Sequence, residues 1–140
     1  MTDKKIDNCK VEVFKIGEEP VDEIQNVSVY GTLRNGERAF RMLEGCSLVK
    51  EGITSMKMKM VNCGAFPALV QDKDDHQVYL ETYKVSGINV KRALDQYEGY
   101  PMLYSKAILT FADGTKSVVY YMRDISREYP EIKSGDWKNR

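Results

Sequence analysis

VSVYGTLRNGE, residues 27–37, reads as a strand that ends abruptly on a glycine, with almost no polar loop before the next helical pattern. Three of its first four residues are β-branched or aromatic, which predicts a strand from Val27 to Tyr30. Consecutive backbone N–H groups after such a strand can form a concave site for a carboxylate or an oxyanion, and a glycine lets the ligand come close because it has no Cβ. Gly31 to Leu33 is therefore a candidate binding loop, and a tight turn with a purely structural role is the alternative.

The strongest helical pattern lies in SGINVKRALDQYEGYP, residues 86–101. Asn89 can cap the start of this helix, and Gly99 stands where a left-handed residue ends one, with Pro101 preventing any continuation. Glu98 is therefore predicted to be the last helical residue. The apolar residues at i, i+3, i+4 and i+7, which would share one buried face, are Val90, Ala93, Leu94 and Tyr97.

A glutamate at this helix end has unusual electrostatics. The carboxyl end of a helix carries partial negative charge, which disfavours ionisation of Glu98, and partial burial would raise the pKa of its carboxyl group further. An acid whose pKa lies nearer neutrality can both take and return a proton. Glu98 is therefore a candidate general acid/base, and a solvated glutamate at a frayed helix end is the alternative.

The remaining patterns predict a small α+β domain. ERAFRML, residues 37–43, predicts a short helix, and Asp113-Gly114 predicts the turn of a hairpin. The run at 11–16 is interpreted either as an extra edge strand or as a semi-ordered arm. Alternating or apolar runs predict the other strands at 53–61, 66–70, 77–85, 104–111 and 116–122, with a polar turn QDKDDH between the second and third of these. The regular spacing of turns indicates a sheet that curls into a small barrel.

Three residue types decide whether metal, disulfide or histidine chemistry is expected. Cysteines stand at 9, 46 and 63 without a C-x-x-C pair, which argues against a disulfide framework and a zinc site. The single histidine, His76, lies in a polar cluster and is interpreted as a solvated loop residue. Methionines at 56, 58 and 60 share one face of a strand, where core filling is favoured over an adaptable binding cavity. We therefore expect no disulfide framework, no zinc site and no site that depends on several histidines.

The composition excludes other classes of function. The 140 residues suffice for one domain, and 21 basic residues balance 21 acidic ones, so there is no basic footprint for nucleic acid. No run approaches the length of a membrane span, and the amino terminus lacks the apolar core of a signal peptide. We expect a cytoplasmic protein with no nucleic acid or membrane partner, and the sequence indicates no oligomeric state.

Read together, these segments resemble the gamma-glutamylcyclotransferase-like superfamily from about Val27 to the end of the chain. YGTL and LDQYEGYPMLY are the specific parts of the resemblance, and the strands between them are generic. The segments that carry it are VYGTLRNG at 29–36, FPALV at 66–70, LETYKV at 80–85, ALDQYEGYPMLY at 93–104, VVYYM at 118–122 and SGDW at 134–137.

The resemblance implies a fold and a set of site residues. The fold would be a small mixed β-barrel with flanking short helices over residues 27–140, which leaves residues 1–26 as an N-terminal extension or edge strand. Glu98 would be the general acid/base of the reaction. The residues that would surround the glutamyl group are Tyr30, Gly31, Thr32 and Leu33 from the loop, with Tyr104 and either Tyr120 or Tyr121, of which Tyr121 is taken as the candidate.

The implied reaction is the cyclisation of a gamma-glutamyl amide. The α-amine of such a substrate lies at a five-membered-ring distance from its own γ-carbonyl carbon, so an enzyme has to fold the substrate and move protons. The products would be 5-oxoproline and a free amine, formed without metal, cofactor or covalent intermediate. A non-catalytic module that binds a small metabolite or a partner is the alternative function. In a third interpretation, the glycine loop and the helix end are purely structural and form no site.

Overall fold

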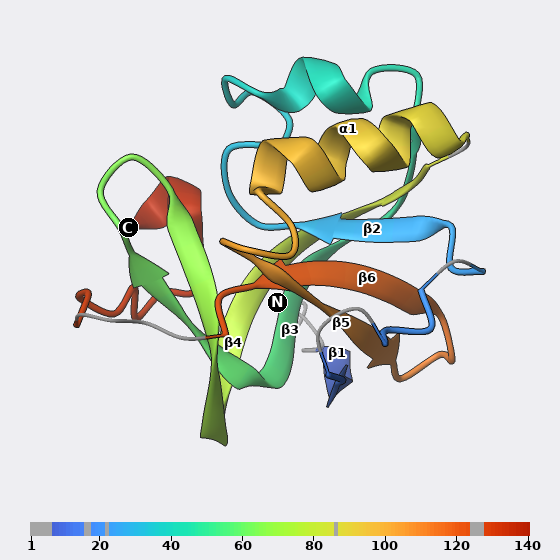
Figure 1. Ribbon diagram of the computed structural model, residues 1–140. Helices are drawn as coiled ribbons and strands as arrows, with labels where there is room; N and C mark the ends of the chain where they lie inside the picture. The colour runs from blue at the N-terminus through green and yellow to red at the C-terminus, as the bar shows by residue number, and fades with distance from the viewer. Residues whose placement is uncertain (1–6, 16–17, 22, 86, 124–127) are drawn as a thin grey trace, which may run out of the picture.

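The computed structural model describes residues 7–15, 18–21, 23–85, 87–123 and 128–140. Six strands close into a barrel with neighbours in the order β1-β3-β4-β2-β6-β5, and helix α1 lies across one side of it (Figure 1). The strands are β1 (Asp7–Val13), β2 (Asn26–Val29), β3 (Ser47–Asn62), β4 (Pro67–Lys84), β5 (Ser105–Phe111) and β6 (Lys116–Tyr121), and the helices are α1 (Ile88–Glu98) and the 3-10 helices η1 (Phe40–Leu43) and η2 (Trp137–Asn139).

The barrel is mixed, because two pairs of neighbours are parallel. β1 runs parallel to β3 and β2 runs parallel to β6, whereas the other neighbours are antiparallel. The predicted α+β class, a small mixed β-barrel with flanking short helices, is therefore confirmed. Asp113 and Gly114 lie in the turn between β5 and β6, as the Asp-Gly signal predicts.

β1 differs in position from the strand predicted at 11–16. It runs from Asp7 to Val13 and has a partner on each side, β3 through Asp7 and Asn8 and β5 through Cys9 to Val13. The pairing with β3 is confined to Asp7 and Asn8, before the run at 11–16, so the edge-strand interpretation of that run remains a prediction. Ile16 lies outside the described residues, and the division of the chain at residue 26 remains a prediction.

β3 and β4 form one long hairpin where three shorter strands were predicted. The register between them shifts from Met56↔His76 to Met58↔Gln71, so residues 72–75 of β4 bulge out of the ladder. The polar QDKDDH sequence is therefore part of the strand, because a bulge lets polar residues face water without ending the pairing. His76 is half-buried and lies in the strand rather than in a solvated loop, a correction to its predicted place.

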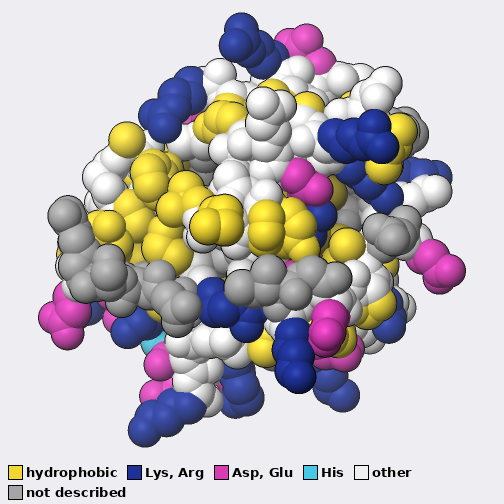
Figure 2. All heavy atoms as spheres, in the orientation of Figure 1, with side chains coloured by type: hydrophobic (Ala, Val, Ile, Leu, Met, Phe, Trp, Pro, Cys, Tyr) yellow, Lys and Arg dark blue, Asp and Glu magenta, His cyan; other side chains and the backbone are white. Residues whose placement is uncertain are grey.

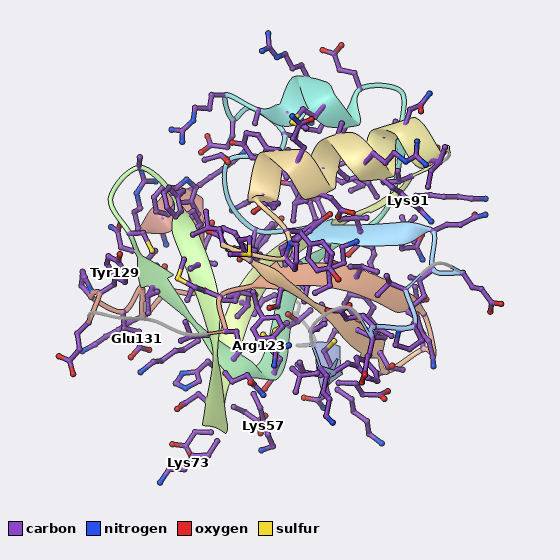
Figure 3. The ribbon with its side chains drawn as sticks, in the orientation of Figure 1. Lys57, Lys73, Lys91, Arg123, Tyr129 and Glu131 are labelled. Carbon is purple, nitrogen blue, oxygen red and sulfur yellow. The ribbon has the colours of Figure 1, made fainter. Side chains whose placement is uncertain are left out.

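The bulge lies far from α1. The Lys57 ammonium donates to the backbone carbonyl of Lys73 across the hairpin. Figure 3 shows both lysines at the end of the molecule opposite α1.

Two hydrophobic clusters stabilise the fold. One fills the barrel, and Met56, Met58 and Met60 are fully buried in it, which confirms their predicted role in the core. The other lies between the outside of the barrel and the layer of α1 and η1, with Leu43 and Leu94 as its fully buried side chains from the two helices. The second cluster fixes α1 against the barrel.

Helix α1 ends as predicted and begins differently. Glu98 is its last residue, and Gly99 adopts the left-handed conformation with φ 66°. Asn89 lies inside the helix rather than at its cap, which is Gly87. The buried stripe is narrower than predicted, because Ala93 and Tyr97 are exposed and only Leu94 of the four is fully buried.

The helix predicted at 37–43 is present only as the single turn η1, Phe40–Leu43. The turns before it carry the loop that follows β2. Among the described residues, none of the helices combines the length and the apolar character needed to cross a membrane.

Candidate active site

A pocket of about 120 Å³ opens where the carboxyl end of α1, the loop after β2 and the turn between β3 and β4 meet. Its size is close to that of a cavity that takes benzene, so it suits one moiety of a small molecule rather than a folded partner. Six of the seven predicted site residues line it, namely Tyr30, Gly31, Thr32, Leu33, Glu98 and Tyr104. The sequence segments at 30–33 and 98–104 are thus brought together by the fold.

Tyr121 does not line the pocket, which corrects its predicted place. Its side chain is fully buried in the cluster inside the barrel, whereas Tyr120 faces the pocket. Successive residues of a strand point to opposite faces, so only one member of the pair could reach the site. Alternation along the strand shows that either Tyr120 or Tyr121 can face the pocket. Which of them does so depends on which face of the barrel α1 covers, and this is set by the tertiary structure.

The glycine loop lines the pocket with three residues whose backbone N–H groups are candidate donors. The hydrogen bonds between described residues include none donated by the backbone N–H groups of Gly31, Thr32 or Leu33. All three residues are buried, and buried N–H groups normally have an acceptor. Donation by Arg34 N–H to the carbonyl of Gly31 (3.0 Å) holds the turn. The arrangement therefore suits a ligand oxygen that carries negative charge.

Gly31 is required by packing against Pro67. A Cβ at this position would lie 2.6 Å from Cγ and 2.7 Å from Cδ of that proline ring, far inside van der Waals contact. The glycine thus allows the loop to lie against the start of β4. This reason differs from close approach of a ligand, which the sequence suggested.

A buried ion-pair cluster fixes the far side of the loop. The Arg34 side chain contacts two carboxylates, through Nε to Glu81 Oε2 at 2.9 Å and through Nη1 to Asp136 Oδ1 at 2.7 Å. The other oxygen of Glu81 accepts from the backbone N–H of Asn35 at 2.8 Å. Arg34 and Glu81 are 4% and 3% exposed, so the charges neutralise each other away from water.

The carboxyl-terminal segment holds the same loop at further points. The Trp137 indole N–H donates to Glu37 Oε1 at 3.0 Å, and the Lys138 ammonium donates to the carbonyl of Asn35. Gly135 lies so close to β4 that a Cβ there would be 1.7 Å from the carbonyl oxygen of Gln77. The SGDW tail therefore supports the loop, a role that the sequence signalled only through its resemblance to known tails.

Glu98 lies half-buried in the pocket, and this burial determines its electrostatics. Burial raises the pKa of its carboxyl group from 4.5 to about 7. The resolved cause is desolvation, whereas the sequence argument invoked the helix end as well. Glu98 is thus near the midpoint of its titration at neutral pH.

The tyrosines around Glu98 stay protonated. Burial raises the pKa of Tyr30 and of Tyr104 above the usual range, and the negative charge of Glu98 adds to both shifts. Their hydroxyl groups donate to backbone carbonyls, that of Tyr120 at 2.7 Å and that of Pro67 at 3.1 Å. They shape the pocket, and Glu98 is the group able to exchange a proton.

Polar contacts position the end of α1 over the pocket. The Asp95 carboxylate pairs with the Lys106 ammonium of β5 at 2.8 Å and accepts from the Tyr120 hydroxyl. Two residues further along α1, the Tyr97 hydroxyl lies 2.8 Å from Thr32 Oγ1 in the glycine loop. These contacts tie the helix that carries Glu98 to β5, β6 and the loop.

In the part of the chain that the structure describes, no group of three His, Cys, Asp or Glu residues stands together as a metal site would require. Cys9, Cys46 and Cys63, all among the described residues, are not joined in disulfides.

Comparison with known proteins identifies related sequences and folds. The profile of the family described as gamma-glutamyl cyclotransferase, AIG2-like, matches residues 27–139. A protein of Vibrio cholerae that carries the provisional name gamma-glutamylcyclotransferase is 33% identical over 115 residues, which are 81% of this chain and 96% of that protein.

Solved structures share the fold at lower identity. An uncharacterised protein of Pyrococcus horikoshii matches with a TM-score of 0.65 and 23% identity, over 81% of this chain and 89% of that chain. A mouse AIG2-like protein matches with a TM-score of 0.59 and 23% identity, over 76% and 82%. At these identities the likeness is one of fold.

Proposed function

Because the chain belongs to the gamma-glutamyl cyclotransferase, AIG2-like family, we propose that its pocket converts a small gamma-glutamyl amide into 5-oxoproline and a free amine. The observation that carries the proposal is that Glu98, whose pKa is about 7, lines the same pocket as loop residues whose N–H groups donate to no other described residue. One group exchanges protons, and the other stabilises negative charge.

The reaction needs three proton transfers and one site for developing charge. The Glu98 carboxylate takes a proton from the α-ammonium of the substrate, and the freed amine attacks the γ-carbonyl carbon. The oxygen of the tetrahedral intermediate accepts hydrogen bonds from the N–H groups of Gly31 to Leu33. The bond to the departing nitrogen then breaks as Glu98 returns its proton to that nitrogen, and the second proton that the attacking nitrogen loses on ring closure passes to the released amine. One substrate thus gives 5-oxoproline and an amine, with no atom left over.

Elimination among the pocket residues supports this role for Glu98. The phenols of Tyr30 and Tyr104 have raised pKa values and donate to carbonyls, so neither accepts a proton at neutral pH. Arg38 carries a permanent positive charge. Among the described residues that line the pocket, Glu98 is the one that both loses and regains a proton near pH 7.

The test is release of 5-oxoproline from a panel of gamma-glutamyl dipeptides and gamma-glutamyl amines. We expect Glu98→Gln to lower turnover by about 100-fold or more, because it removes general acid–base catalysis. Glu44→Gln changes an exposed glutamate outside the pocket and should retain turnover. Binding of substrate without any release of 5-oxoproline would contradict the proposal and favour a binding module.

A further inference from the structure

The pocket lining combines polar groups with apolar side chains. Glu98 and the glycine loop supply polar groups, and Phe66, Tyr97 and Leu103 supply ring or aliphatic surface. Tyr97 is 42% exposed and Leu103 is 51% exposed, although both line the pocket. Figure 2 shows hydrophobic side chains gathered on this face, between the carboxyl end of α1 and the β3–β4 turn.

Hydrogen bonds engage the backbone or the hydroxyl group of each member of this apolar shelf, Phe66, Tyr97 and Leu103. The hydroxyl of Tyr97 is engaged with Thr32 Oγ1 at 2.8 Å, which leaves its ring as the surface available for contact. Leu103 N–H donates to the carbonyl of Gly99 at 2.8 Å, and the carbonyl of Phe66 accepts from Cys63 N–H at 3.0 Å. The backbone under the shelf is therefore fixed by hydrogen bonds within the protein, so binding an apolar group there requires little ordering of the main chain.

The cyclisation dictates which part of a substrate meets the shelf. The glutamyl α-amine and γ-carbonyl must lie at Glu98 and the loop. The substituent on the departing nitrogen then points towards the opening, because the rest of the pocket is occupied by the closing ring. This direction brings it against Phe66, Tyr97 and Leu103.

We infer, resting on the proposed function, that the departing amine carries an apolar side chain, which the shelf of Phe66, Tyr97 and Leu103 binds. The charge at the opening supports this choice. Arg38 lines the pocket, and its guanidinium donates to the carbonyl of Ala65 beside Phe66 at 3.1 Å. A cation at this position disfavours a departing amine that carries a second positive charge.

The test compares two substrates of nearly equal shape, gamma-glutamyl-leucine and gamma-glutamyl-asparagine. We expect kcat/KM for the leucine compound to be higher by about tenfold or more, the discrimination that a small difference in buried apolar surface supports. Leu103→Ser should bring the ratio of the two values towards one. Met102→Ser is the matched control, because Met102 is 93% exposed, adjacent in sequence and outside the pocket lining.

A binding measurement separates the inference from the catalytic role of Glu98. The dissociation constants of both dipeptides for the Glu98→Gln protein, measured by calorimetry, should favour the leucine compound in the same direction. Equal kcat/KM values for the two dipeptides would overturn the inference while leaving the proposed function intact. If neither dipeptide releases 5-oxoproline and the two bind equally, the inference and the proposed function are both overturned.

Discussion

Replacing Glu98 by glutamine should stabilise the protein at alkaline pH and leave its stability almost unchanged at acid pH. The carboxyl group is half-buried, and its pKa rises from 4.5 to about 7 on folding because water is excluded from it. The folded protein therefore holds this proton more tightly than the unfolded chain does. As pH rises from about 4.5, the unfolded chain ionises first, and the free energy of unfolding falls until the folded protein also ionises near pH 7.

The size of the effect comes from the same pKa values. One pKa unit corresponds to about 1.4 kcal/mol, so the rise from 4.5 to about 7 corresponds to a loss of about 3 kcal/mol of stability above pH 7. Glutamine has no ionised form and does not suffer this loss. The stability gained by Glu98→Gln should therefore be about 3 kcal/mol larger at pH 8 than at pH 4.

The assay is urea denaturation of the wild type and Glu98→Gln at pH 4 and at pH 8. The result is the change in unfolding free energy that the substitution causes at pH 8 minus the change that it causes at pH 4. Effects of substitution that do not depend on pH cancel in this quantity. Glu44→Gln, at an exposed site, should change stability by no more than about 0.5 kcal/mol at either pH. A Glu98→Gln effect that is the same at both pH values would refute the claim that burial raises the pKa of this carboxyl group.

Other perturbations test the loop and the proton exchange. Asp136→Ala removes one of the carboxylates on Arg34, so we expect stability to fall by about 2 kcal/mol, with reduced turnover; unchanged turnover would mean that the tail does not support the loop. Gly31→Ala would place a Cβ 2.6 Å from Pro67 Cγ, so the loop must shift, and turnover should fall by about 100-fold; wild-type kcat would contradict this. Because Glu98 must be ionised to accept a proton, kcat/KM should rise with pH through about 7, and a flat profile would exclude it as the base.

Local chemistry made part of the site predictable. The end of α1 follows from a glycine and a proline next to Glu98, and the abrupt end of β2 follows from Gly31. Both signals act within a few residues, where backbone conformation is set by the residue type itself. Their meeting in one pocket could be expected only from the family resemblance, because the distance between them in space depends on the whole barrel.

Local sequence patterns could not predict the register between strands. The polar run before His76 has the composition of a turn, yet it lies in β4, because a shift of register with β3 takes residues 72–75 out of the ladder. The choice between Tyr120 and Tyr121 failed for a related reason. A period of two divides the residues of a strand into two faces, but it does not say which face a helix covers.

The buried ion pairs that support the glycine loop were the least predictable feature, because they depend on contacts between segments far apart in the sequence. Alternation along β4 places Val78 and Leu80 inside the barrel and would leave Glu81 facing water. Glu81 is instead buried, because the loop after β2 and the carboxyl-terminal segment cover the outer face of the strand at this point. Arg34 can be buried there only with a carboxylate on either side, and one of them, Asp136, comes from 102 residues further along the chain. A charged pair that reads as two solvated residues in the sequence thus holds the backbone that faces the substrate in the proposed reaction, so substitutions in the tail should alter catalysis without touching the pocket.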